Sequence, residues 1–306
     1  MSTIDWLLES DPALRWQVLR DLTDASPADV AAERAKVAHA GFGTQLLAAQ
    51  GDDGRWGGGT FFPRGIGTFD TLHVLTLLGP DPHDAAVQRA IAPVHEVARW
   101  DYDDSFRFWD GEVEPCINGR VVAIGTYFGQ DVSGIVDRLL GEQMADGGWN
   151  CEQENGSTRG SFDTTINVLE GLLAYERAHD AAEDVTAARR RGEAYLLDRH
   201  LLRRASDNEI GQERWLRIGF PYSWEYDLLR ALDHLRAAGS EADERASEAL
   251  DILESKRDPD GRWPMETSYH DAMHIDLGEP VGQPSRWTTH RALRVLRWAG
   301  RDDGST

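Results

Sequence analysis

Residues 141–176 read GEQMADGGWNCEQENGSTRGSFDTTINVLEGLLAYE and contain the pattern that decides the fold. A Gly-rich polar loop, which begins near Gln143 and contains Trp149, leads into an apolar segment that starts around Asp163. Apolar residues at helical spacing after the loop predict an α-helix. The loop and the helix that follows it form one unit, and this unit recurs elsewhere in the chain.

Two further copies of the unit are found by comparing the chain with itself. The loop QGDDGRW (50–56) precedes GTFDTLHVLTLLG (67–79), and the loop RDPDGRW (257–263) precedes PSRWTTHRALRVLRW (284–298). Three more segments share the helical half without the tryptophan loop, at 10–22, 114–129 and 220–235. Several of these six segments are apolar on more than one face, which predicts burial on two sides.

More polar amphipathic stretches separate the six segments, at 27–50, 85–100, 132–143, 182–202 and 241–257. Each is expected to form a helix with one solvated face. No run of alternating apolar and polar residues demands a sheet, and 262–287 reads as a long loop. We therefore predict an all-α fold of about six helical hairpins that close into an α/α toroid (an α6–α6 barrel), a single domain covering residues 1–306.

The amino-acid composition excludes several classes of function. The 306 residues include 53 acids against 32 Lys and Arg, for a net charge of −21, which repels polyanions and argues against nucleic-acid binding. The first residues do not have the pattern of a signal peptide, so we expect none, and no apolar run in the sequence is long enough to span a membrane. With only two cysteines, Cys116 and Cys151, a disulfide framework is not expected, so we predict a cytoplasmic protein.

The Gln-x3-Gly-x-Trp element at 50–56 and 143–149, and its Arg257 variant, resembles the QW motif of the terpenoid cyclase and protein prenyltransferase superfamily, whose members include squalene cyclase. The resemblance covers nearly the whole chain and implies an α/α toroid. We expect the tryptophan to have a packing role, with its indole N–H on a backbone carbonyl and the Gln side chain on free groups at helix ends.

The leading functional hypothesis is an acid-initiated, class II cyclase-like reaction, an isomerisation or cyclisation of an apolar isoprenoid in a central funnel. In such cyclases an Asp protonates an alkene or epoxide, and aromatic rings stabilise the cation. The resemblance implies Asp163 and Asp70 at inner-helix starts, and Asp103 within the Asp101–Asp104 run, as catalytic candidates. Helix capping is the alternative for Asp70 and Asp163, and a solvated loop is the alternative for Asp103.

The expected cavity wall follows from the same helix starts, if these gather at the mouth of the funnel. We expect substrate contacts from eight residues: Trp16, Phe69, Cys116, Asn118, Phe162, Trp224, Tyr226 and Trp287. Cyclases of this type place their site between two helical domains, so a single domain predicts a homodimer or a partner subunit.

A zinc-dependent, prenyltransferase-like enzyme is the second hypothesis, and Zn²⁺ or Mg²⁺ are the candidate cofactors. Prenyltransferases bind zinc with Asp-x-Cys and a His at a later helix start; here Glu114 and Cys116 resemble the first pair, and Asp163 stands in place of the His. Cys151 is either a fourth ligand or a packed thiol. Three arginines lie close to inner-helix starts, and they either bind a diphosphate or neutralise nearby acids: Arg120, Arg159 and Arg286. A ligand-binding toroid without catalysis is the third hypothesis.

Overall fold

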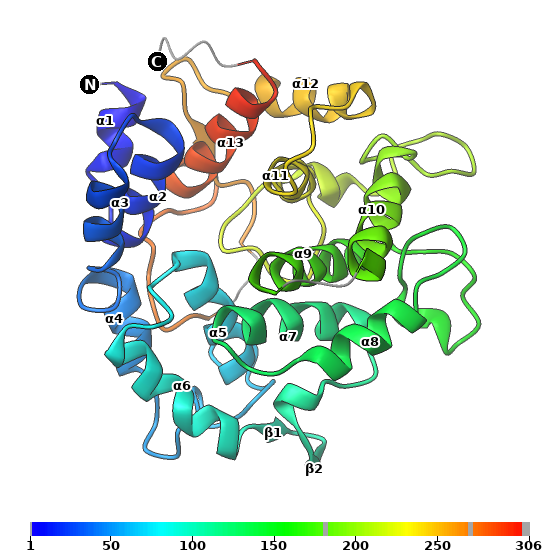
Figure 1. Ribbon diagram of the computed structural model, residues 1–306. Helices are drawn as coiled ribbons and strands as arrows, with labels where there is room; N and C mark the ends of the chain where they lie inside the picture. The colour runs from blue at the N-terminus through cyan, green and yellow to red at the C-terminus, as the bar shows by residue number, and fades with distance from the viewer. Residues whose placement is uncertain (1, 180–182, 269–271, 302–306) are drawn as a thin grey trace.

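The computed structural model describes residues 2–179, 183–268 and 272–301, which are mostly α-helical (Figure 1). The α-helices are α1 (Thr3–Leu8), α2 (Pro12–Leu22), α3 (Pro27–Arg34), α4 (Gly41–Ala48), α5 (Thr68–Leu78), α6 (Ala85–Val97), α7 (Pro115–Tyr127), α8 (Ser133–Gly141), α9 (Phe162–Ala178), α10 (Glu183–Leu197), α11 (Leu228–Ala237), α12 (Ser247–Ser255) and α13 (Arg286–Trp298). Two short antiparallel pairs join β1 (Arg99–Trp100) to β2 (Asp103–Arg107) and β3 (Trp263–Pro264) to β4 (Pro284–Ser285).

The prediction of a mainly helical chain is confirmed, and each of the six segments that we expected to be buried contains a helix. Two boundaries differ from the expectation. The stretch 27–50 forms two helices, α3 and α4, and the segment 220–235 becomes helical only at Leu228. Asp227 accepts a hydrogen bond from the Arg230 N–H and caps α11 there.

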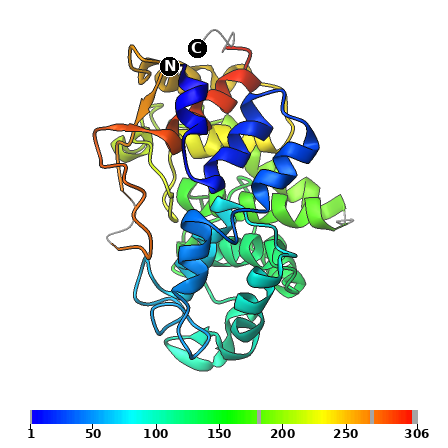
Figure 2. The ribbon, with the colours of Figure 1, turned by 90° about the vertical axis from the view of Figure 1, so that its left-hand side faces the viewer.

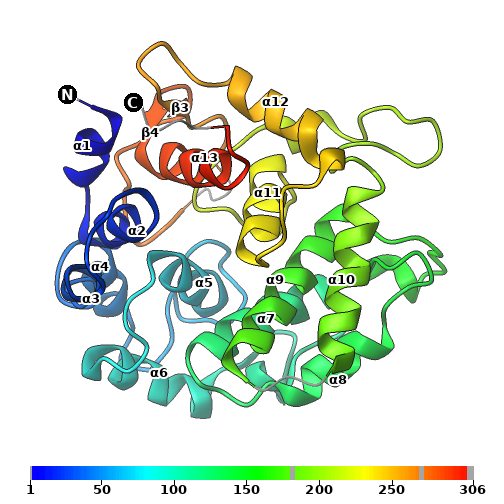
Figure 3. The same ribbon diagram turned by 45° about the horizontal axis from the view of Figure 1, so that its top comes forward.

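Neighbouring inner helices pack against one another in the order α5, α7, α9, α11, α13 and α2. The contact between α2 and α5 includes two side-chain hydrogen bonds, from Trp16 to the Leu78 carbonyl and from Gln17 to the Leu77 carbonyl. In Figure 3 these six helices lie nearer the middle of the molecule, whereas α4, α6, α8, α10 and α12 lie towards its periphery. Helix α1 packs against α13, so the first and last helices lie side by side (Figure 2).

The three tryptophans of the repeated loop make the same contact. Each indole N–H donates to the carbonyl of the leucine ten residues earlier, in the preceding outer helix. The pairs are Trp56 with Leu46 at 2.6 Å, Trp149 with Leu139 at 2.7 Å and Trp263 with Leu253 at 2.7 Å. These bonds satisfy carbonyls near helix ends, and they confirm the packing role predicted from the motif.

The glutamines of the motif also bond backbone carbonyls, as predicted. The Gln143 amide donates to Gly147 and to Ala188 on α10, both at 2.8 Å. Gln50 makes the equivalent pair of bonds to Gly54 and to Ala90 on α6. The motif thereby joins a loop to the next outer helix.

Helices α7 and α9 approach each other closely because glycines face their contact. A Cβ atom on Gly119 would lie 2.5 Å from the Asn167 carbonyl oxygen, and one on Gly171 would lie 2.3 Å from the Gly119 oxygen. No side chain larger than hydrogen fits at either position without moving a helix. This packing fixes the amino-terminal ends of α7 and α9 beside each other.

The interior between the inner helices differs from the apolar well that we expected. Buried Arg230 pairs with Glu170, and buried Asp233 pairs with Arg294 and Arg291. Such charges are tolerated inside a protein when they are paired and hydrogen-bonded. The middle of the helical array therefore contains an ion-pair network.

None of the described helices combines the length and the apolar character that crossing a membrane requires.

Candidate functional site

A cavity of about 510 Å³ lies at the amino-terminal ends of α7 and α9. One set of its lining residues is aromatic: Phe61, Phe62, Phe69, Trp100, Tyr102 and Trp224. Phe62, Tyr102 and Trp224 expose large parts of their side chains, so apolar surface extends out to the mouth. The lining also includes two thiols, four carboxylates and two arginines.

Glu114, Cys116 and Cys151 form a cluster of potential metal ligands in this cavity, with one donor atom from each lying within 4.8 Å of the others. The two Sγ atoms are 3.0 Å apart, and Cys116 Sγ lies 3.6 Å from Glu114 Oε2. Glu114 and Cys116 flank Pro115, the first residue of α7. The close packing of α7 and α9 brings them to the loop that carries Cys151.

Contacts with α9 hold the Cys151 loop. Cys151 follows Trp149, whose N–H and indole are both hydrogen-bonded. The Thr164 hydroxyl lies 3.4 Å from both the Cys151 backbone nitrogen and its Sγ. The repeated tryptophan unit thus positions a thiol as well as a helix.

The two thiols influence each other's ionisation. The hydrogen bond with Cys151, together with burial, raises the pKa of Cys116, whereas the hydrogen bond with Cys116 lowers the pKa of Cys151. The first proton of the pair therefore leaves Cys151, and a second thiolate beside it is disfavoured. A divalent cation between the sulfurs would remove this penalty, because metal-bound thiols are deprotonated.

The structure brings the predicted ligands Glu114 and Cys116 together, but the third donor of the cluster is Cys151 and not the predicted Asp163. Asp163 lines the same cavity but lies outside the cluster. Its carboxylate accepts a hydrogen bond from the Tyr226 N–H at 2.7 Å and pairs with the Arg214 guanidinium. These contacts satisfy Asp163 in place of a metal or helix cap; Ser161 caps α9.

Two thiolates and one carboxylate match the preferences of Zn²⁺, which binds sulfur and oxygen ligands in four-coordinate sites. Mg²⁺ requires oxygen ligands in octahedral geometry, so this donor set does not fit it. Three protein ligands leave a fourth position for water or substrate, as in catalytic zinc sites.

Asp70 does not have the environment of a protonating acid. Its buried carboxylate accepts hydrogen bonds from Arg64 at 2.9 Å and from the Gly65 N–H at 2.7 Å. Burial alone would raise the pKa of Asp70, but the guanidinium groups of Arg120 and Arg64 hold it below its ordinary value. A lowered pKa favours the ionised carboxylate, which does not suit the predicted role of proton donor.

Asp103 is equally unsuited to proton donation, because it lies on the exposed strand β2 and not among the residues that line the cavity. Hydrogen bonds from the Ser105 hydroxyl and N–H lower its pKa. Its neighbour Asp101 has a structural role, because its carboxylate accepts the N–H groups of residues 60–62. Asp103 is therefore exposed to solvent, as the alternative held, but it lies on a strand and not in a loop.

Glu112 is the acid that sequence reasoning missed. It lines the cavity, and burial raises its pKa, although hydrogen bonds from Glu114 N–H and Val113 N–H oppose the shift. Asn118 fixes the Glu112 backbone by accepting its N–H at 2.8 Å and donating to its carbonyl at 2.7 Å. Asn118 therefore positions this acid and does not line the cavity itself.

Of the eight predicted contact residues, Phe69, Cys116 and Trp224 line the cavity. Phe162 and Tyr226 lie behind it in an aromatic cluster with Trp215, where the Phe162 and Trp215 rings stack at 4.2 Å. Trp287 stacks on Phe220 at 4.1 Å. These three aromatic residues are buried in the core and do not line this cavity.

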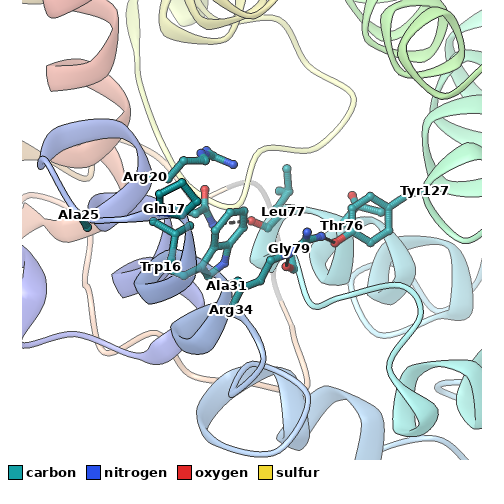
Figure 4. Close-up of a pocket in the computed structure, with 12 residues that line it drawn as sticks. Trp16, Gln17, Arg20, Ala25, Ala31, Arg34, Thr76, Leu77, Gly79 and Tyr127 are labelled. Carbon is teal, nitrogen blue, oxygen red and sulfur yellow. Dashed lines mark hydrogen bonds between the residues drawn. The ribbon is translucent and has the colours of Figure 1, made fainter.

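Trp16 belongs to a different cavity of about 630 Å³, shown in Figure 4. The guanidinium groups of Arg20 and Arg34 lie over its ring at 4.5 and 5.1 Å. The lining described for this second cavity includes no thiol, imidazole or carboxylate. The chemistry-bearing side chains of the predicted site therefore gather in the smaller cavity.

Comparison with known proteins does not assign the chain to a family. No family model matches the chain, and no curated protein matches it. Among solved structures, a protein from Actinoplanes is similar at 15% identity over 97% of this chain and 90% of that chain, with a TM-score of 0.46.

Proposed function

We propose that this chain is a zinc-dependent enzyme, built as an α/α toroid, that acts on a small molecule in the cavity beside α7 and α9. The observation that carries the proposal is the convergence of the Cys116, Cys151 and Glu114 donor atoms within 4.8 Å on the cavity wall. The order of helix contacts and the three equivalent tryptophan bonds support the toroid.

The donor set indicates the role of each ligand. Cys116 and Cys151 would supply two thiolates, and Glu114 the third donor. Zinc in such a site polarises a bound oxygen or lowers the pKa of a bound water or thiol. The aromatic residues provide apolar surface for a substrate, and the Glu112 carboxyl can hold a proton within the same cavity.

Metal content tests this proposal directly. Protein produced without an affinity tag and purified without added metal should contain about one zinc per chain. Inductively coupled plasma mass spectrometry measures this content. Cys116→Ser and Cys151→Ser should each lose most of the zinc, while Asp163→Asn, a matched control, should keep it. Wild-type protein that remains metal-free after incubation with Zn²⁺ would rule the proposal out.

The second candidate function is the acid-initiated reaction on an isoprenoid alkene, with Glu112 in place of the three predicted aspartates. One observation favours it: an acid with a raised pKa lies in the same cavity as six aromatic residues. Aromatic faces can stabilise a developing carbocation. In this reaction the Glu112 proton would add to the alkene and form a carbocation. The carbocation would then lose a proton to a base or be captured by water.

Solvent labelling separates the two candidates. Acid-initiated turnover of an isoprenoid alkene in D₂O should place deuterium in the product, survive metal removal and disappear in Glu112→Gln. Turnover that needs zinc and persists in Glu112→Gln would support the zinc enzyme instead.

A further inference from the structure

The guanidinium of Arg120 is the least satisfied charged group around the cavity. Only 2% of the residue is exposed, and Nε, Nη1 and Nη2 all lack a hydrogen-bond partner among the described residues. An unpaired buried charge is strongly disfavoured in a folded protein. Arg120 nevertheless lines the cavity, so its donors are placed where a bound molecule can reach them.

Asp70 does not satisfy these donors. Arg64 Nε, Arg64 Nη2 and the Gly65 N–H already bond its two oxygens. Arg120 Nη2 remains 3.8 Å from Asp70 Oδ1, beyond hydrogen-bond distance. Asp70 therefore attracts the Arg120 charge without occupying its N–H groups.

The nearby charges do not balance. Arg64 and Arg120 share Asp70, whereas the next arginine, Arg230, has Glu170 as its own partner. Two guanidinium groups therefore share one directly paired carboxylate, and the Arg120 N–H groups have no hydrogen-bond acceptor among the described residues. The Phe69 ring lies beneath the Arg120 guanidinium, 4.6 Å from its Cζ atom.

Helix geometry places this charge beside the proposed metal site. Cys116 and Arg120 are four residues apart on α7 and both line the cavity. Side chains at this spacing lie on one helix face, with Cβ atoms about 5–6 Å apart. A molecule bound to Arg120 therefore reaches the Cys116 thiol with its next few atoms.

We propose that the molecule bound in this cavity carries a carboxylate or phosphate group, which Arg120 binds through its free N–H groups. The inference deepens the proposed function, on which it rests, because it names the substrate class of the same site: an anionic group joined to an apolar or aromatic body. The guanidinium fork suits both anions, and the aromatic residues suit the body.

The acids around the cavity restrict where the anion binds. Four acids line the cavity. Glu114 belongs to the thiol cluster, Glu112 accepts a hydrogen bond from the Glu114 N–H, Asp163 is paired with Arg214, and Glu152 is exposed. They leave Arg120 and Arg64 as the cations of the lining. Burial lowers the pKa of Arg120 to about 10, against the opposing effect of Asp70, so the guanidinium is protonated at neutral pH.

Three small probes with a shared ring test the proposal: benzoate, phenyl phosphate and neutral benzamide. Titration calorimetry on the wild-type protein should show that at least one anion binds and that benzamide does not compete with it. Arg120→Gln should weaken that anion about 10- to 100-fold, the expected cost of losing charged hydrogen bonds. Arg159→Gln, which removes an exposed arginine outside this cavity, controls for net charge.

Two further measurements separate this inference from the zinc proposal and from misfolding. Zinc content should be unchanged in Arg120→Gln, and Arg120→Lys should restore part of the affinity. In the wild type, the NMR signal of the Arg120 Nε–H, identified by its loss in Arg120→Lys, should shift when the anion is added. The shift can be read even if Arg120→Gln does not fold.

Three results would overturn the inference while leaving the zinc proposal intact. They are equal binding of benzamide and the anions, an unshifted Arg120 signal under saturating anion, and anion binding that Arg120→Gln retains but Cys116→Ser abolishes. The last result would place the anion on the metal. A metal-free protein that still binds the anion through Arg120 would instead refute the zinc proposal alone.

Discussion

The sulfur atoms of Cys116 and Cys151 lie 3.0 Å apart, although the residues are separated by 35 positions in the chain. Such proximity suits two kinds of chemistry, joint ligation of a metal and oxidation to a disulfide. In metal-free protein, hydrogen peroxide should oxidise the pair: the two thiols lose two electrons and two protons, an S–S bond forms, and peroxide becomes two waters.

Bound zinc should slow this oxidation, because it occupies the thiolates. The measurement is mass spectrometry after thiol alkylation, which should find both cysteines blocked in oxidised metal-free protein and free again after reduction. Cys151→Ser provides the control, since its remaining thiol has no partner. Two alkylated cysteines after peroxide treatment of the metal-free wild type would contradict the geometry.

Gly119→Ala should destabilise the protein and weaken metal binding together. The added Cβ would lie 2.5 Å from the Asn167 carbonyl oxygen and push α7 away from α9, at a cost of about 1–3 kcal/mol in the free energy of unfolding. Gly134→Ala on α8 is the matched control, since no atom lies within 4 Å of its Cβ position. Urea denaturation and zinc affinity, measured on both variants, check the prediction.

Trp149→Phe should lower the free energy of unfolding by about 1–3 kcal/mol, because the buried Leu139 carbonyl loses its N–H partner. Trp224→Phe should cost less, since Trp224 is partly exposed at the cavity mouth. Thermal unfolding of the two variants provides the comparison. Equal losses would mean that the motif tryptophan is no more important to the fold than a surface indole.

These contacts show which parts of the fold can be predicted from the sequence. The repeated loop predicted the tryptophan and glutamine bonds because donor and acceptor lie within one local unit or its neighbour. The polar interior was not predictable in this way. Arg230 and its partner Glu170 are 60 positions apart, and a single sequence does not reveal that pairing.

In the candidate site, too, local features were predicted and contacts between distant residues were not. Glu114 and Cys116 were predicted because their spacing at a helix start resembles the zinc-binding Asp-x-Cys pair of prenyltransferases. Cys151 was left open as a ligand, and only the α7–α9 contact places it on Cys116. The raised pKa of Glu112 depends on burial by distant residues, for which the sequence has no signal. Asp70 bonds Arg64, six positions away, but its second cation, Arg120, lies 50 positions away, so the sequence shows only part of the charge around this acid.

Stability should fall between pH 6.5 and pH 4 because of His290. Burial lowers the pKa of His290 to about 4, with Arg294 and Arg20 adding to the shift and Asp21 opposing it. The unfolded chain, with an ordinary His pKa near 6.5, binds a proton first as the pH drops, so the folded state loses about 3 kcal/mol across this window.

Denaturation curves measured at intervals from pH 7 to pH 4 check this prediction. In His290→Gln, which keeps an N–H donor for Asp21, the slope over this window should be shallower than in the wild type. Parallel pH profiles of the two proteins would mean that His290 is protonated as readily in the folded state as in the unfolded chain.

The central claim is a zinc ion held by two thiolates and one carboxylate, and X-ray absorption at the zinc edge measures that coordination directly. We expect two sulfur ligands at about 2.3 Å and two oxygen ligands at about 2.0–2.2 Å in the wild type, and fewer than two sulfur ligands around any zinc that Cys151→Ser retains. A zinc spectrum without sulfur ligands, or one that Cys116→Ser and Cys151→Ser leave unchanged, would contradict it.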